Sequence, residues 1–214
     1  MRCFQTAPLL LMLCLATYPT TVWGDSKTES VCRMLQAEEL GQISPLHRSG
    51  QIYLAGQPGE DDFNLIQKAG VKTVINLRPS RELKWDEAMY LKMLNLDYVQ
   101  IPFRAPESLT PAVFDQCRKL LNDKSKQPLV LHCASANRVG AIWLTHRVLD
   151  DGLSFEAALT EAKQVGLKTP GYIEQARAYI AQQGKVEQAS RFYRFPVCRN
   201  TSQRVRGETL TFSR

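Results

Sequence analysis

Six consecutive residues carry the groups with chemical potential, Cys133-Ala-Ser-Ala-Asn-Arg138. A cysteine in a loop that opens a helix is favoured as a thiolate, because the helix dipole places partial positive charge there. The free N–H groups at such a helix start also suit an oxyanion. An arginine can bind two oxygens of a phosphoryl or sulfuryl group. The spacing therefore predicts a nucleophile, Cys133, and an anion clamp, Arg138, in one loop.

The flanking residues predict the elements that position this loop. Residues 129–131 form a short apolar run after a proline, which is typical of a buried strand. From Arg138 onward, apolar residues return at helical spacing as far as Asp150. We therefore expect the loop to join the carboxyl end of a strand to the start of a helix, an arrangement that favours anion binding.

The alternation of strand and helix patterns predicts an α/β fold, with a central, mainly parallel sheet of about four to five strands flanked by helices. Strands are expected at 51–55, 71–77, 98–102 and 129–132. Helices are expected at 61–69, 82–94, 111–121, 138–150, 154–165 and 172–183, with a short additional helix around 32–40. Because ligands bind beyond the carboxyl ends of parallel strands, the loops at 76–78 and 103–108 are expected to converge on Cys133.

Residues 1–24 are interpreted as a secretory signal peptide. Arg2 is positively charged, the apolar segment from Ala7 to Ala16 follows it, and Gly24 supplies a small residue before the expected cleavage site. This segment is too short to span a bilayer, and no later stretch is apolar enough. We expect an exported protein, periplasmic or secreted, without stable membrane insertion.

The remaining chain divides into a polar lead-in at 25–49, one α/β domain at 50–184 and a basic tail at 185–214. From residue 184 to the end there are seven Lys or Arg residues and two Asp or Glu residues. The tail has no nucleic-acid-binding signature, so we interpret it as a solvated terminus and expect no nucleic-acid partner.

Cysteine and histidine usage argues against a metal site. The sequence has no C-x-x-C pair and three histidines, so neither zinc nor another cofactor is expected. In an exported protein, Cys32 and Cys198 are candidates for a disulfide between the two ends of the mature chain. Cys117 is expected on a buried helix face, and a regulatory Cys117–Cys133 pairing stays open because spacing does not determine connectivity.

The loop resembles the His-Cys-(x)-Arg signature of cysteine-dependent, dual-specificity-like protein phosphatases. Over about residues 50–183, consecutive segments are similar to the bacterial branch related to the beta-lactamase-hydrolase-like group, in which four residues between Cys and Arg are usual. These segments are Ile-Tyr-Leu-Ala-Gly-Gln-Pro, Gly-Val-Lys-Thr-Val-Ile-Asn-Leu-Arg, Tyr-Val-Gln-Ile-Pro and Val-Leu-His-Cys. The resemblance implies a phosphotyrosine-phosphatase-like fold and a monomer that hydrolyses phosphate monoesters of proteins or small molecules.

The resemblance also implies roles for individual residues. Cys133 would form a cysteinyl-phosphate that water then hydrolyses, while Arg138 stabilises charge on the phosphoryl oxygens. His132 would order the loop by hydrogen bonding. The residues expected to bind substrate are Ala134, Ser135, Ala136, Asn137 and Arg78.

Several features depart from better-known members of that family. The loop has four residues between Cys133 and Arg138 instead of five, and it contains no glycine, so Ser135 or Asn137 is expected to adopt any strained turn. Val139 stands where a hydroxyl residue often follows the arginine.

The aspartic general acid expected after the third strand is also missing, and Glu107 is the hypothesised proton donor. Arg81 and Arg104 are candidates for additional anion contacts.

Two other functions fit parts of the pattern. Rhodanese-type sulfurtransferases place a cysteine in a similar loop with this shorter spacing, and they need no general acid. A third hypothesis is a binding module for phosphorylated or sulfated ligands. The upstream segments favour a phosphatase over a sulfurtransferase, and the presence of both Cys133 and Arg138 favours an enzyme over a binding module.

Overall fold

The computed structural model describes the backbone of residues 34–192 and the side chains of residues 34–184. Its sheet has six strands in the order β1-β2-β3-β6-β4-β5. Their bounds are β1 Gln36–Ala37, β2 Leu46–Ser49, β3 Ile52–Ala55, β4 Thr73–Asn76, β5 Asp97–Gln100 and β6 Leu129–His132. Strands β3, β6, β4 and β5 are parallel, whereas β1 and β2 add an antiparallel edge. The α/β fold and its four predicted strands are confirmed, with strand ends that differ by no more than two residues.

The two additional strands lie in the region interpreted as a lead-in. The helix expected around 32–40 is wrong over its described part, in which β1 is flanked by residues without regular structure. Strand β2 pairs with β3 through a tight hairpin in which Ser49 faces Ile52. Gly50 makes this hairpin with φ +60°, a conformation in which glycine has no Cβ to clash.

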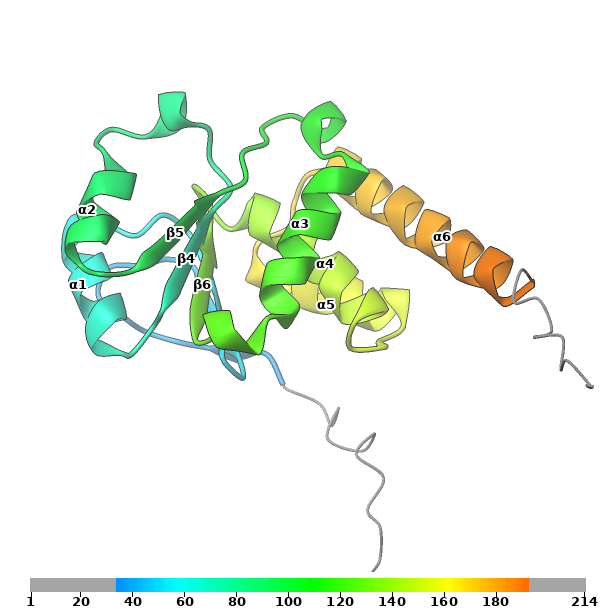
Figure 1. Ribbon diagram of the computed structural model, residues 1–214, viewed down its shortest axis with the longest axis horizontal. Coiled ribbons are helices and arrows are strands. Elements are labelled where there is room, and N and C mark those ends of the chain that lie inside the picture. The colour runs from blue at the N-terminus through cyan, green and yellow to red at the C-terminus, as the bar shows by residue number, and fades with distance from the viewer. Residues whose placement is uncertain (1–33, 193–214) are drawn as a thin grey trace, which may run out of the picture. The chain divides into compact units, whose positions relative to one another are not determined.

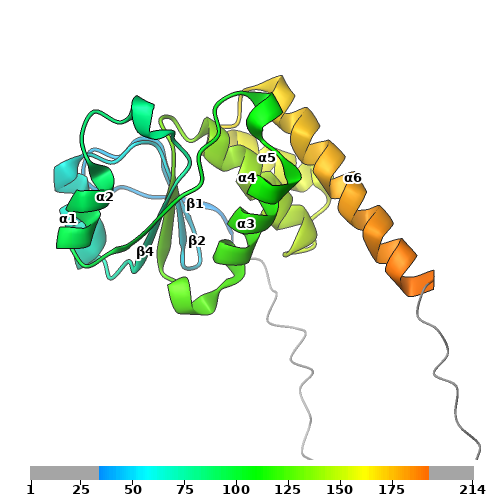
Figure 2. The ribbon, with the colours of Figure 1, turned by 45° about the horizontal axis from the view of Figure 1, so that its top comes forward.

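Helices cover both faces of the sheet (Figure 1). Helices α1 (Glu60–Lys68) and α2 (Glu87–Met93) lie on one face. On the other face are α3 (Pro111–Asn122), α4 (Asn137–Leu149), α5 (Phe155–Val165) and α6 (Pro170–Phe192), as the turned view in Figure 2 also shows. The sheet therefore has two hydrophobic cores, one on each side.

Strand β6 contributes to both cores because neighbouring side chains point to opposite faces. Leu129 and Leu131 pack with the α3–α6 layer, and Cys133 follows them on that side. Val130 packs with the α1–α2 layer. The ring of His132 likewise faces α1, with its centroid 6.0 Å from that of Phe63.

Helix ends differ from the sequence predictions in two places. The helix expected at 82–94 is a 3-10 turn, η2 (Ser80–Glu82), followed by α2, which begins later because Asp86 accepts a hydrogen bond from Met89 N at 2.9 Å. Helix α6 does not end at Gly184 but continues to Phe192. The predicted cap of α5 is confirmed, since Ser154 accepts from Ala157 N at 3.3 Å.

Within residues 34–192, no helix is both long and apolar enough to cross a membrane.

Candidate active site

The Cys133 loop lies between β6 and α4, at the carboxyl edge of the parallel strands. Asn76 at the end of β4 is in register with both His132 and Gln100 at the ends of β6 and β5. The three connections that follow these strands therefore begin at one level. This confirms the predicted convergence of the loops.

Ala136 is the residue that reverses the chain from strand to helix. It has φ +58° and ψ 4°, which is the left-handed conformation, and it is fully buried. The expectation that Ser135 or Asn137 adopts the strained turn is wrong, because the reversal falls on the residue directly before the helix.

The start of α4 has backbone donors available for an anion. Gly140 N, bonded to Ala136 O at 2.9 Å, makes the first helical hydrogen bond, so the N–H groups of Asn137, Arg138 and Val139 have no helical partner. No side chain caps this helix. Together with the adjacent Cys133, these groups form a candidate anion cradle at the helix start.

Arg138 is held in place from several sides. Its Nη1 donates to Phe103 O at 2.8 Å and to Leu77 O at 3.2 Å, and its Nη2 donates to Glu82 Oε2 at 2.7 Å. The residue is 8% exposed. Two of its acceptors, Leu77 O and Phe103 O, belong to the segments that follow β4 and β5. These contacts hold the guanidinium in place beside Cys133.

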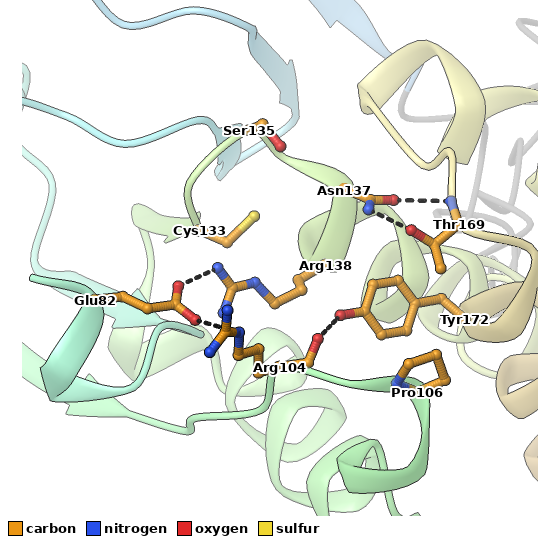
Figure 3. Close-up of a pocket in the computed structure, with 9 residues that line it drawn as sticks. All are labelled: Glu82, Arg104, Pro106, Cys133, Ser135, Asn137, Arg138, Thr169 and Tyr172. Atoms are coloured by element: carbon orange, nitrogen blue, oxygen red, sulfur yellow. Dashed lines mark hydrogen bonds and ion pairs between the residues drawn. The ribbon is translucent and has the colours of Figure 1, made fainter.

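Glu82 is a site residue that the sequence analysis missed. It lies on η2 and contacts three arginines, with Arg138 closest, Arg78 Nε at 3.4 Å and Arg104 Nε at 3.8 Å. Figure 3 shows its contacts with Arg138 and Arg104. Burial raises the pKa of the Glu82 carboxyl, but Arg138 and Arg78 outweigh this, and the pKa lies below its usual value. Glu82 is therefore an ionised partner for the arginines rather than a proton donor.

A pocket of about 410 Å³ opens over Cys133 and Arg138. Its further lining residues are Glu82, Arg104, Pro106, Ser135, Asn137, Thr169 and Tyr172. Cys133 lies at the inner wall with 1% exposure. The pocket thus combines the cysteine, the arginine clamp and the helix start in one cavity.

Tyr172 and Pro106 form the wall opposite the loop (Figure 3). The Tyr172 hydroxyl donates to Arg104 O, and its ring meets Phe103 edge to face at 5.7 Å between centroids. Burial raises the pKa of Tyr172, so it stays a neutral phenol. Neither wall residue carried a signal in the sequence beyond its helical or loop position.

Three of the predicted site residues have different surroundings from those expected. The Asn137 side chain is hydrogen-bonded to Thr169 and to the backbone of Lys168. Arg78 does not line the pocket but contacts Glu82 and Gln57. Glu107 is exposed and its neighbour Pro106, not Glu107 itself, lines the cavity.

His132 lies beneath the loop, on the α1–α2 side of the sheet. Its ring is fully buried, and Nε2 is 3.2 Å from Oε1 of the buried Glu87. Burial raises the pKa of Glu87, but His132, Gln57 and Asn76 outweigh it and the pKa lies below its usual value. His132 therefore belongs to a buried polar cluster beneath the loop and does not line the pocket.

Two disulfide pairings were considered from the sequence, Cys117–Cys133 and Cys32–Cys198. Cys117 and Cys133 are both free and buried, so the suggested pairing between them is not formed. Cys32 and Cys198 lie outside the described residues. Among the residues that the structure describes, no group of three or more His, Cys, Asp or Glu side chains is arranged to hold a metal ion.

A sequence model of the family described as "DSP-PTPase phosphatase fused to NAD+ Kinase" matches residues 30–188. The chain belongs to this family. The DSP-PTPase match includes every element from β1 to most of α6, together with the complete pocket.

Relatives of this DSP-PTPase chain include the dual specificity protein phosphatase TpbA from Pseudomonas aeruginosa. The UCBPP-PA14 protein is 26% identical over 139 residues, which is 64% of this chain and 62% of TpbA. The chain thus matches less than two thirds of the length of that relative.

Solved structures show the same DSP-PTPase fold. A crystal structure of P. aeruginosa TpbA superposes with a TM-score of 0.57 and 24% identity, covering 73% of this chain and 97% of TpbA. A putative phosphatase from Shewanella putrefaciens CN-32 gives 0.56 and 22%, covering 66% and 94%. The predicted phosphatase-like fold is confirmed, and nothing in these matches favours a sulfurtransferase.

Proposed function

We propose that this protein is a cysteine-dependent phosphatase that hydrolyses phosphate monoesters. The observation that carries the proposal is the pocket in which Cys133, the fixed Arg138 guanidinium and the uncapped start of α4 meet. Membership of the DSP-PTPase family supports it. The relative named as a dual specificity protein phosphatase, TpbA, supports the same reaction class.

The reaction has two displacements at phosphorus. The Cys133 thiolate forms an S–P bond while the bond to the leaving-group oxygen breaks, and that oxygen takes a proton from solvent or from a donor at the pocket mouth. Water then attacks phosphorus, the S–P bond breaks and the thiolate is restored. Arg138 and the N–H groups of α4 stabilise the charge on the non-bridging oxygens in both steps.

The substrate is proposed to be a phosphorylated protein or small molecule bound by a monomer. A TpbA variant has been solved in complex with pTyr. In this chain, the wall of Tyr172 and Pro106 offers an apolar surface next to the phosphate cradle, which would suit the ring of an aryl phosphate.

The test uses the purified protein under reducing conditions, with p-nitrophenyl phosphate as substrate. Cys133→Ser should abolish phosphate release, and Arg138→Lys should lower kcat/KM by about 10²–10³-fold because lysine cannot bind two oxygens in a fork. Thiosulfate-to-cyanide sulfur transfer is measured in parallel.

Cys117→Ser is the matched control. Burial raises the pKa of Cys117 to about 12, so it is an inert thiol, and it does not line the pocket. This variant should keep the activity of the unmodified protein. Phosphate release that survives Cys133→Ser, or sulfur transfer without phosphate release, would contradict the proposal.

We also propose that residues 1–24 direct export to the periplasm or the cell exterior. The support is the sequence pattern alone, a positive residue followed by an apolar segment and a small residue. Fusion of residues 1–24 to a reporter that folds only in an oxidising compartment should give activity there. Replacing Leu10 and Leu13 with Asp should retain the reporter in the cytoplasm, and equal export of both fusions would contradict the signal-peptide interpretation.

A further inference from the structure

We propose that Gln57 is a positioning residue that couples the two ends of the catalytic loop. The inference rests on the proposed phosphatase function. Gln57 follows β3 and does not line the pocket. Its backbone contacts the loop next to the nucleophile, and its side chain contacts the residues that hold the arginine.

The first link runs from Gln57 to the start of the loop. The backbone N–H of Gln57 donates to Ala134 O at 3.3 Å, directly after Cys133. Gly56 and Ser135 form a β-bridge at the same place. The segment after β3 therefore pairs with the loop, and its position helps to set that of Cys133.

The second link anchors the Gln57 amide on a buried carboxylate. Gln57 Nε2 donates to Glu87 Oε2 at 2.8 Å, and Glu87 is 1% exposed. The other oxygen of Glu87 accepts from Asn76 Nδ2 at 2.6 Å and lies near His132. Since Glu87 contacts the ends of β4 and β6, Gln57 is fixed relative to the sheet rather than to solvent.

The third link runs from Gln57 to Arg138. Gln57 Oε1 accepts from Arg78 Nη1 at 2.5 Å. Arg78 in turn contacts Glu82 through Nε and also donates to the Glu82 carbonyl. The same Glu82 Oε2 accepts from Arg138 Nη2 at 2.7 Å.

These links form a continuous path outside the loop, from Ala134 to Arg138. The path needs a side chain at position 57 that donates to one carboxylate and accepts from one arginine at the same time. An amide does both, whereas a carboxylate only accepts. Gln57→Glu therefore keeps the size of the side chain and its contact with Arg78. Its carboxylate faces the Glu87 carboxylate and the Pro58 carbonyl, to both of which the amide donates.

The experiment is a reciprocal exchange measured by kcat and KM with p-nitrophenyl phosphate. Gln57→Glu should lower kcat by about 10- to 100-fold, because small misplacements of catalytic groups have effects of this size. Adding Glu87→Gln restores one donor and one acceptor across the contact and should recover kcat to within about fivefold of the starting protein. KM should change less than kcat in the single variant.

A binding measurement separates this proposal from the phosphatase function. In the Cys133→Ser background, titration calorimetry with inorganic phosphate reports assembly of the cradle without turnover. Gln57→Glu should weaken phosphate binding by about tenfold, and the exchange should restore it. If the unmodified protein releases no phosphate from any substrate, this titration still decides the role of Gln57.

Two further variants control for folding and for the chemistry of the substitution. Gln67→Glu removes a comparable amide donor, to Leu94 O at 2.8 Å between α1 and α2, and should leave kcat unchanged. Gln57→Met keeps the volume and serves in place of Gln57→Glu if that variant does not fold. Wild-type kcat and phosphate binding in the Gln57 variants, or a loss that the exchange does not restore, would overturn the proposal.

Discussion

Ala136 is buried in a backbone conformation that side chains rarely adopt. The left-handed conformation costs a residue with a Cβ roughly 1–2 kcal/mol, yet the position must make the turn that presents Cys133 and the α4 N–H groups to the same ligand. Gly166 packs against this turn, so closely that a Cβ built there would be 3.2 Å from that of Ala136. Two small residues at this contact allow the loop to close.

The first prediction follows from this geometry. Ala136→Val should lower the free energy of unfolding by about 2 kcal/mol or more, because a branched side chain is strained at positive φ and overfills the contact with Gly166. Urea unfolding measures the change. Ala134→Val is the control, since Ala134 is exposed and is not at positive φ, and it should change stability by no more than about 0.5 kcal/mol. Equal effects of the two substitutions would contradict the assigned strain.

At the scale of elements, a partly buried ionic cluster joins α3, α4 and α6. Arg118 on α3 binds both oxygens of Asp150 at 2.7 Å and donates to Tyr179 OH on α6 at 2.9 Å. His146 Nδ1 is 3.1 Å from the same carboxylate. The cluster fixes the helices whose other ends carry Arg138 and Tyr172.

Asp150→Asn should therefore destabilise the protein by about 2–3 kcal/mol, since it leaves the partly buried Arg118 without its counter-charge. The control is Asp97→Asn, which removes the exposed Asp97–Lys126 pair and should cost no more than about 1 kcal/mol. An equal loss in the free energy of unfolding of Asp150→Asn and Asp97→Asn would contradict a larger contribution from the less exposed pair.

The Asp150 contribution should depend on pH in a defined direction. Burial raises the pKa of Asp150, but Arg118 and His146 outweigh it and hold the pKa well below its usual range. A carboxyl with a lowered folded pKa stabilises above its unfolded pKa of about 3.9, and this stability is lost as the pH falls through the folded pKa. The difference between Asp150 and Asp150→Asn proteins should be constant above about pH 5 and shrink below about pH 4. A difference that grew on acidification would contradict the assignment.

At the scale of the whole described chain, Asn137 connects the catalytic loop to the last helix. Its Oδ1 accepts from the backbone N–H groups of Lys168 and Thr169 at 2.8 and 3.2 Å, and its Nδ2 donates to Thr169 Oγ1 at 2.7 Å. The residues after Thr169 begin α6 and place Tyr172 in the pocket. One side chain thus sets the distance between the cradle and the opposite wall.

We expect Asn137→Ala to lower the free energy of unfolding by about 2–3 kcal/mol, because backbone donors lose their acceptor. It should also raise KM for p-nitrophenyl phosphate, since the Tyr172 wall is no longer fixed. Thr169→Val removes the hydroxyl alone and should cost about 1 kcal/mol. An unchanged KM in Asn137→Ala would show that α6 is positioned by its core contacts without this link.

Local patterns in the sequence were enough to predict the strands and helices around the site. The apolar run at 129–131 and the helical spacing after Arg138 placed β6 and α4, because burial on both faces of a parallel strand or on one side of a helix imposes those periods. The Cys133 and Arg138 pair was likewise readable, since both lie in one short loop. The start of α5 was predicted from Ser154 because a cap is a contact over three residues.

The distant polar residues that meet at the loop could be identified only after the chain was seen folded. Glu82 is 56 positions from Arg138 in the sequence, and it lies in a polar stretch that has no periodic signal of its own. Gln57 and Glu87 are 30 positions apart and pair only because β3, β6 and β4 are neighbours in the sheet, with Glu87 against the ends of β6 and β4. Which residue adopts the left-handed turn was also decided here, by where β6 ends and α4 begins. Strands and helices follow from interactions between residues close in sequence. The contacts at the loop depend on the order of strands in the sheet, and no local pattern predicts that order.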